Sequence, residues 1–359
     1  MLPLGIYIHI PFCKSKCPYC SFYSIKEEKP FIENYILSIC KEIKKWSKIL
    51  NYEVDTIYFG GGTPSVLDAK NIVKIIKEIK KNFKVNFPEI TLEVNPADYS
   101  SLDFEMLKFE GINRISVGAQ SLEEPELKIL GRRHNVKDII NTYNEVKKSQ
   151  IENISFDFIL GSPIQTIKSV EKIIDFYKDN NPAHMSAYIL KIEEGTPFSK
   201  SNLNFASDDF CSDIYIYLSE KMKELGYNHY EISNFSLPEK HSNHNLKYWN
   251  LDNYLGLGPS AHSLIKNKRF YYEENFDFNI KFEGLGGSEE EYAMLRLRLA
   301  EGLTEKGYKE KFGKAIPEKY FKKSKKFQDL GLVNIDKNKI NLTEKGFLLS
   351  NKIISELIL

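Results

Sequence analysis

The residues Cys13-Lys14-Ser15-Lys16-Cys17-Pro18-Tyr19-Cys20 place three cysteines in one short stretch, directly after the apolar run Gly5–Ile10. The other two cysteines, Cys40 and Cys211, stand alone. A structural zinc ion prefers four protein ligands, whereas a four-iron cluster takes one thiolate for each iron. The three clustered thiolates therefore predict an iron–sulfur cubane held by Cys13, Cys17 and Cys20, with one iron open to another ligand.

Zinc is the alternative occupant of this cysteine stretch. A zinc ion would have to recruit His9 or a more distant side chain as its fourth ligand. The spacing also differs from the paired C-x2-C arrangement that is usual for zinc. We therefore favour the cluster.

Composition sets the broad class of the protein. The 359 residues are 42% hydrophobic and 28% charged, which is ordinary for a soluble protein of one or two domains. The net charge of +1 gives no overall attraction to nucleic acid. An odd number of cysteines does not form a disulfide framework, and we find no signal-peptide pattern and no membrane span. We expect a cytoplasmic protein, and peripheral contact with a membrane stays open.

Strand-like and helix-like segments alternate through the first half of the chain. The apolar, strand-like runs are Gly5–Ile10, Val54–Phe59, Ile90–Val94, Arg114–Val117, Ile154–Leu160 and His184–Leu190. Segments with helical periodicity separate or follow them: Phe31–Leu50, Ala69–Phe83, Leu102–Phe109, Val136–Lys148, Ile167–Tyr177 and Asp208–Leu225. This alternation predicts an α/β fold with a parallel sheet, and six such units would make a partial (β/α)6 barrel of the TIM type.

Polar and glycine residues gather where these strands end. Gly60-Gly61-Gly62-Thr63-Pro64 follows the second strand, Glu93 ends the third and Gln120 follows the fourth. Asp157 lies within the fifth strand and Tyr188 within the sixth. Because parallel α/β folds carry their sites at the carboxyl ends of the strands, these residues predict a single active-site mouth that includes the cysteine stretch.

The pattern changes after Gly226, and we divide the chain into three parts. Residues 1–226 form the barrel, 227–287 form an aromatic and histidine-bearing connecting region, and 288–359 form a C-terminal domain. Helices at Glu289–Ala300 and Pro317–Leu330, followed by a hairpin of Leu332–Ile335 and Lys339–Leu342, predict a winged-helix-like α+β module.

The C-x3-C-x2-C spacing, with Tyr19 just before the last cysteine, resembles the signature of the radical S-adenosylmethionine (SAM) superfamily. The resemblance implies a [4Fe-4S] cluster held by three cysteines, with SAM chelating the fourth iron. Tyr7-Ile8-His9-Ile10-Pro11-Phe12-Cys13 resembles the first strand of the branch that contains oxygen-independent coproporphyrinogen III oxidase, and Gly60–Pro64 resembles the glycine-rich SAM loop of that branch. His134 is interpreted as a surface histidine without a role. The SAM contacts implied by the resemblance are Tyr7, Tyr19, Gly61, Gly62, Thr63, Glu93, Gln120, Arg132 and Asp157.

Two features divide the close relatives within this branch. Coproporphyrinogen oxidases carry a further cysteine two residues after the cluster motif, and Phe22 occupies that position here. The stretch His244-Asn245-Leu246-Lys247-Tyr248-Trp249 resembles the H-N-x-x-Y-W motif of the HemW-type haem chaperones, and His229–Phe235 and Gly256–His262 also resemble that family. The resemblance implies a haem site at His244, Asn245, Tyr248 and Trp249, with His244 or, in its place, His241 as the iron ligand.

Three hypotheses about function follow. The leading one is a chaperone that binds the cluster, SAM and haem, and passes haem to an acceptor such as a respiratory haem protein. The second is radical oxidative decarboxylation of coproporphyrinogen III, which Phe22 puts in doubt, so that enzymatic activity is left open. The third is a nucleic-acid-binding regulator, suggested by the C-terminal module and the five lysines of Lys319–Lys326. From Ser288 onward fifteen Lys and Arg stand against eleven Asp and Glu, so we expect no nucleic-acid partner.

Overall fold

The computed structural model describes residues 2–358, and its main feature is a twelve-stranded sheet with the order β14-β13-β12-β11-β1-β4-β5-β6-β7-β8-β10-β9. Six parallel neighbours form its centre, as the sequence predicts. They are β1 (Pro3–Ile10), β4 (Glu53–Gly61), β5 (Lys84–Val94), β6 (Arg114–Gln120), β7 (Asn153–Leu160) and β8 (His184–Ile189).

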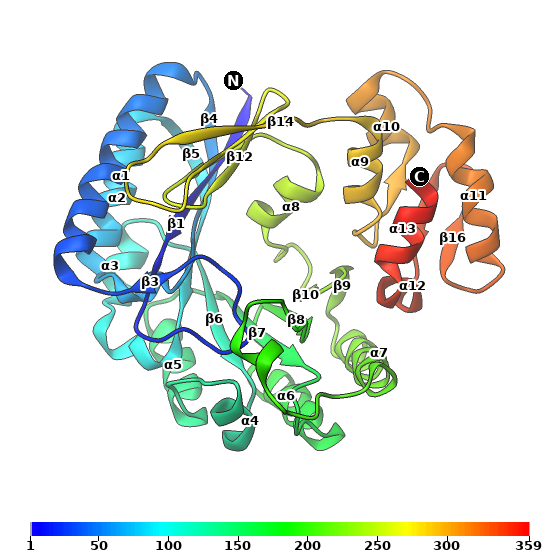
Figure 1. Ribbon diagram of the computed structural model, residues 1–359, viewed down its shortest axis with the longest axis horizontal. Coiled ribbons are helices and arrows are strands. Elements are labelled where there is room, and N and C mark those ends of the chain that lie inside the picture. Colours follow the sequence, from blue (N-terminus) through cyan, green and yellow to red (C-terminus); the bar gives the residue numbers. More distant parts are fainter. Residues whose placement is uncertain (1, 359) are drawn as a thin grey trace.

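Helices follow these strands and cover the outer face of the curved sheet (Figure 1). The principal ones are α1 (Lys29–Ile49), α2 (Ala69–Asn82), α3 (Phe104–Phe109), α5 (Val136–Lys148), α6 (Ile167–Asn180) and α7 (Asp208–Glu224), and a short α4 (Glu124–Ile129) precedes α5. Local signals position them: Asn135 and Asp138 form a capping box at α5, and Thr166 caps α6. The six βα units confirm the predicted partial barrel.

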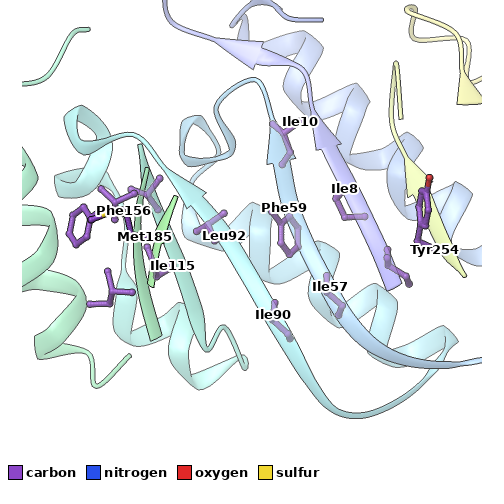
Figure 2. Packing of buried hydrophobic residues seen from close by; sticks show 14 of the residues in the cluster. Ile8, Ile10, Ile57, Phe59, Ile90, Leu92, Ile115, Phe156, Met185 and Tyr254 are labelled. Atoms are coloured by element: carbon purple, nitrogen blue, oxygen red, sulfur yellow. The ribbon is translucent and has the colours of Figure 1, made fainter. Parts of the chain in front are cut away.

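The two faces of the central strands differ in chemistry. Figure 2 shows the outer face, where Ile8, Ile57, Phe59 and Leu92 pack beneath the helices, all with no exposed surface. Burying one such side chain contributes about 1.5–3 kcal/mol, so this layer carries much of the stability. The alternate residues point inward and are polar, because successive side chains of a strand face opposite sides.

The connecting region adds strands to both edges of the central sheet, which the sequence analysis did not predict. These strands are short, so they carry little periodicity. On one edge β10 (Asn234–Ser236) pairs with β8, and β9 (Asn228–Glu231) pairs with β10. On the other edge β11 (Tyr254–Leu257) lies parallel to β1 and is followed by an antiparallel meander. The meander strands are β12 (His262–Ile265), β13 (Lys268–Tyr272) and β14 (Ile280–Leu285).

These additions keep the barrel open. Within the described chain β1 has β4 and β11 as neighbours, and β8 has β7 and β10, so the first and last barrel strands do not pair. The helix α8 (Asn243–Trp249), which carries the H-N-x-x-Y-W motif, lies in Figure 1 between the β1 side and the β8 side of this open barrel.

The C-terminal domain combines helices with a three-stranded sheet of order β15-β17-β16. The predicted hairpin is confirmed as β16 and β17, whereas α10 was not predicted, because a Lys- and Glu-rich helix carries weak periodicity. Backbone hydrogen bonds from Ile232 N to Arg298 O and from Ala300 N to Tyr230 O join this domain to β9. Its elements are α9 (Glu289–Arg296), β15 (Leu303–Thr304), α10 (Glu305–Phe312), α11 (Glu318–Gln328), β16 (Val333–Ile335), β17 (Lys339–Leu342), α12 (Glu344–Leu348) and α13 (Ser350–Ile358).

Among the helices of residues 2–358, none combines the length and the apolar character needed to cross a lipid bilayer.

Candidate cofactor site

The cysteine stretch forms a loop that is closed at its base. Residues Phe12–Cys13 (β2) pair in parallel with Ile25–Lys26 (β3), and Glu27 N donates a hydrogen bond to Cys13 O at 3.2 Å. Within the loop Cys20 N bonds Cys17 O at 3.1 Å, which makes a tight turn. The chain between the two short strands is thereby held over the carboxyl end of β1.

A cavity of about 450 Å³ lies beneath this loop, a volume within the range of small-molecule sites. It brings together all of the predicted cluster and SAM residues except Tyr7. The predicted residues that line it are Cys13, Cys17, Cys20, Tyr19, Gly61, Gly62, Thr63, Glu93, Gln120, Arg132 and Asp157. The sequence therefore identified one continuous surface whose members come from six segments of the chain.

The glycine loop allows the backbone to come close to the cysteine loop. Gly62 N donates to Ile10 O and Thr63 N donates to Phe12 O, both at 2.8 Å. A Cβ atom on Gly62 would lie 2.8 Å from Phe12 O and 3.1 Å from Cys13 Sγ, so a side chain does not fit there. Gly61 has a φ of 113°, which L side chains rarely adopt.

Arg132 contacts the cluster loop directly. Its Nη1 lies 3.2 Å from Cys17 Sγ and 3.4 Å from the Tyr19 hydroxyl, and its Nη2 donates to Gly118 O at 3.0 Å. Its Nε is buried and has no hydrogen-bond partner among residues 2–358. A guanidinium in this position stabilises negative charge on the Cys17 sulfur while leaving one donor free for a ligand.

Two carboxyl groups form the floor of the cavity. The Tyr58 hydroxyl donates to Glu93 Oε1 at 2.8 Å, and burial, with a smaller contribution from the charge of Asp157, raises the pKa of Glu93 to about 7. Ser116 donates to Asp157, and burial raises the pKa of that carboxyl too. Because buried carboxylates favour a cationic or hydroxyl-bearing partner, this pair suits a sulfonium nucleotide with a ribose.

Gln120 has a φ of 69°, a conformation uncommon outside glycine that is often found at functional sites. His134 supports the backbone next to it: Nε2 lies 3.0 Å from Ala119 O, and Nδ1 lies 3.3 Å from Asn95 Oδ1. The interpretation of His134 as a surface residue is therefore wrong. Its side chain is buried, and this burial lowers its pKa to about 3.

Asp98 is a structural residue of the site that the sequence analysis missed. Its buried carboxylate accepts hydrogen bonds from Lys14 Nζ at 2.8 Å, Arg133 Nη2 at 3.0 Å and Ser65 Oγ at 3.2 Å. It thus joins the cysteine loop to the segments after β4 and β6. Its position three residues after Asn95, at the end of a predicted strand, was the only available signal.

Tyr7 and His9 lie on the inner face of β1, behind the glycine loop. The Tyr7 hydroxyl lies 3.1 Å from His9 Nδ1, and His9 Nε2 lies 3.3 Å from Tyr23 O. Both nitrogens of His9 are thus engaged within the protein. Burial also lowers its pKa to about 4.

The residues around the cysteine loop fit an iron–sulfur cluster better than a zinc ion. Within residues 2–358 no group of three or more His, Cys, Asp or Glu side chains is arranged to hold a single metal ion, and His9 is occupied. An anionic iron–sulfur cluster fits better. Three thiols line the cavity, the backbone at Gly62 comes close to Cys13, and the cation Arg132 contacts Cys17. The donor set supports the cluster over zinc.

The predicted haem residues do not line this cavity. His244 lies on α8 beside Thr56 of β4, nearer the amino ends of the barrel strands, and its ring centre is 6.4 Å from that of Tyr7 and 5.2 Å from that of Tyr58. Its Nδ1 is 2.8 Å from Thr56 Oγ1, and its Nε2 is 2.9 Å from the Tyr248 hydroxyl. Only 1% of His244 is exposed, and burial lowers its pKa to about 3.

Contacts at both ends hold α8 in place. At its start Glu89 accepts hydrogen bonds from the backbone of Asn243 and His244, both at 3.0 Å. Lys247 pairs with Asp55 at 2.7 Å. At its end the Arg298 guanidinium lies 4.7 Å from the centre of the Trp249 ring. Asn245, like Tyr248 and Trp249, is half-buried on this helix. The motif therefore links the barrel to the C-terminal domain.

Comparison with known protein families defines the class of protein. Residues 7–177 match the Radical SAM superfamily, and residues 290–349 match the HemN C-terminal domain. The fold is similar to that of coproporphyrinogen III oxidase (HemN) from Escherichia coli, with a TM-score of 0.84 and 21% identity over 99% of this chain and 90% of that one. The chain is thus a radical SAM protein, a class that implies a [4Fe-4S] cluster and SAM.

Similar full-length sequences narrow the family further. The chain is 34% identical to a protein of Buchnera aphidicola subsp. Schizaphis graminum over 98% of this chain and 97% of that protein. Proteins of Lactococcus lactis and Bacillus subtilis are each 31% identical, over 97% or more of both chains. All three are named heme chaperone HemW, and the chain therefore belongs to the heme chaperone HemW family.

Proposed function

We propose that this protein binds haem as a cargo and transfers it to an acceptor protein, with a bound cluster and SAM supporting that role. The observation that carries the proposal is near-full-length similarity to proteins named heme chaperone HemW. Phe22, at the position where coproporphyrinogen oxidases have a further cysteine, favours a chaperone over a decarboxylase. We place this activity in the cytoplasm and leave the acceptor unidentified.

The cavity residues would hold the two cofactors in distinct ways. Cys13, Cys17 and Cys20 would ligate the cluster, whose open iron supplies a binding position and an electron source. The glycine loop offers backbone groups at close range, and Glu93 and Asp157 offer acceptors to the ribose and the sulfonium. These side chains bind and orient; Arg132 keeps the charge of the cysteine loop balanced.

The assignment of His244 as haem ligand stays a prediction. Both of its ring nitrogens are engaged and α8 is held at both ends, so coordination of haem there requires the helix to move. Asn245, Tyr248 and Trp249 would have to move with it.

A reconstitution experiment tests the proposed function. The protein is loaded anaerobically with iron and sulfide and titrated with haemin while the Soret band is followed, and haem transfer to an apo-haem protein is then measured. We expect saturable binding and transfer that weaken in the Cys13/Cys17/Cys20→Ala variant. The proposal is contradicted if the wild-type protein takes up no more haem than this triple variant.

The fold likeness to coproporphyrinogen III oxidase is the observation that favours a second candidate, the radical decarboxylation of coproporphyrinogen III. The same reconstituted sample, supplied with dithionite, SAM and coproporphyrinogen III without oxygen, tests it. Formation of protoporphyrinogen by the cluster-loaded protein would support the enzyme; its absence with an intact cluster would remove it.

A further inference from the structure

An exposed apolar rim surrounds the mouth of the cofactor cavity. Phe22, from the cluster loop, is 66% exposed, and Tyr188 and Ile189, at the end of β8, are 44% and 39% exposed. All three line the same cavity as the cluster cysteines, and Leu190 joins them. An exposed apolar group beside a built cavity indicates a ligand or a partner.

Positive charges border this rim. Lys16 is exposed and donates from Nζ to the backbone oxygen of Phe22 at 3.0 Å, so that its charge lies next to the Phe22 backbone. Lys191 follows Leu190, and its side chain is 80% exposed with Glu193 as its partner. Both lysines line the cavity. The mouth thus combines apolar surface with two cations near its edges.

This combination matches the chemistry of haem, a flat apolar macrocycle that carries two propionate carboxylates on one edge. From this match, and resting on the proposed function, we propose that haem binds across the mouth of the cavity. The macrocycle lies against Phe22, Tyr188 and Ile189, and the propionates lie toward Lys16 and Lys191. The cargo is then next to the cluster and SAM, and α8 keeps its structural contacts.

Other exposed aromatic side chains do not lie at the cavity. Phe87 is 98% exposed and Phe109 is 87% exposed, but neither belongs to the cavity formed by the described residues. They provide matched controls, because replacing either one changes surface apolarity and charge without touching the mouth.

Haem bound at the mouth of the cavity would affect the exchange of SAM. Haem at the mouth would cover the opening through which SAM exchanges, so bound haem slows the dissociation of SAM. Haem held on a displaced α8, at the opposite ends of the strands, would leave that opening free.

The test uses full-length, cluster-loaded protein and haemin as the probe. We expect Phe22→Glu to weaken haem binding by ten-fold or more and Phe22→Leu to change it less than three-fold, with Phe109→Glu like wild type. We also expect haem to slow the release of labelled SAM in the wild type but not in Phe22→Glu. Circular dichroism and iron content establish that each variant is folded and loaded.

The possible failures are distinguishable. If His244→Ala loses haem binding while Phe22→Glu binds like wild type, the mouth is not the haem site but the proposed chaperone function stands. If Phe22→Glu binds haem normally but no longer transfers it, the rim serves the acceptor protein and this inference is overturned. If the wild type binds no haem, the proposed function falls and this inference falls with it.

Discussion

Arg132 and Cys17 are 115 residues apart in the chain, yet Arg132 Nη1 lies 3.2 Å from Cys17 Sγ beside the cavity. The same guanidinium is anchored to Gly118 O at the end of β6. The segment between α4 and α5 thus places a positive charge against a loop near the start of the chain. Residues that contact a metal ligand in this way change the affinity for the metal, although they do not bind it themselves.

Arg132→Gln tests this relationship. The substitution keeps a donor near the cysteine loop but removes the charge, so we expect the affinity for the cluster to fall about 10–100-fold. The measurement is iron and sulfide content after reconstitution, followed by the rate of cluster loss to a chelator. Arg269→Gln, on β13, is the matched control and should retain its cluster. Equal chelation rates for wild type and Arg132→Gln would refute the role.

Glu93 makes stability depend on pH. Its pKa is about 7 in the folded protein, raised first by burial, against about 4.5 in the unfolded chain. Both states are protonated below pH 4.5, so the carboxyl makes no difference there. As the pH rises toward 7 the unfolded chain ionises first, and the folded state loses relative stability.

Glu93→Gln should remove this dependence. We expect the cofactor-free variant to come close to wild type near pH 4.5 and to exceed its free energy of unfolding by about 3 kcal/mol at pH 8. Urea unfolding at several pH values measures the difference, and Glu105→Gln, at an exposed helical position, serves as the control. A constant difference between Glu93→Gln and wild type across this range would count against it.

Much of this structure could be predicted because its signals are local. The apolar run Gly5–Ile10 predicted β1, and the polar residues at strand ends predicted the cavity. The edge strands were missed because β9, β10 and β11 have three or four residues each and depend on the barrel for their partners.

Contacts between distant residues explain the other errors. Asp98 and His134 look like ordinary polar residues in the sequence, since their burial results from three segments that meet only in the folded chain. The environment of His244 likewise depends on Thr56, which is 188 residues away. A motif names the residues of such a cluster but does not show whether a ligand can reach them.

Gly62 tests the close approach of the glycine loop to the cysteine loop. A methyl group there would meet two carbonyl oxygens of the backbone, Phe12 O at 2.8 Å and Ile10 O at 2.9 Å, which cannot rotate away. We expect Gly62→Ala to lower the free energy of unfolding by about 1–3 kcal/mol and to reduce cluster loading by moving Cys13.

The control for Gly62 is Gly195→Ala. Gly195 has a φ of 83°, but a Cβ atom there would have no described atom within 4 Å. That variant should show only backbone strain of about 1–2 kcal/mol and normal iron content. Thermal unfolding and iron analysis of both variants separate the two effects. Normal cluster loading in Gly62→Ala would show that the loop tolerates displacement.

Trp249 is the last residue of α8, and it tests whether this helix couples the barrel to the C-terminal domain. Trp249→Ala removes the ring that the Arg298 guanidinium contacts. We therefore expect the free energy of unfolding to fall by about 1–2 kcal/mol and hydrogen exchange to become faster in both α8 and α9. The Arg298→Lys variant keeps a cation and should lose less. Because α8 also holds His244 against Thr56, the faster exchange should extend to the first half of β4 but not to the glycine loop at its end. Exchange confined to α9 would mean that the C-terminal domain moves independently of α8, and that the motif is anchored by the barrel alone.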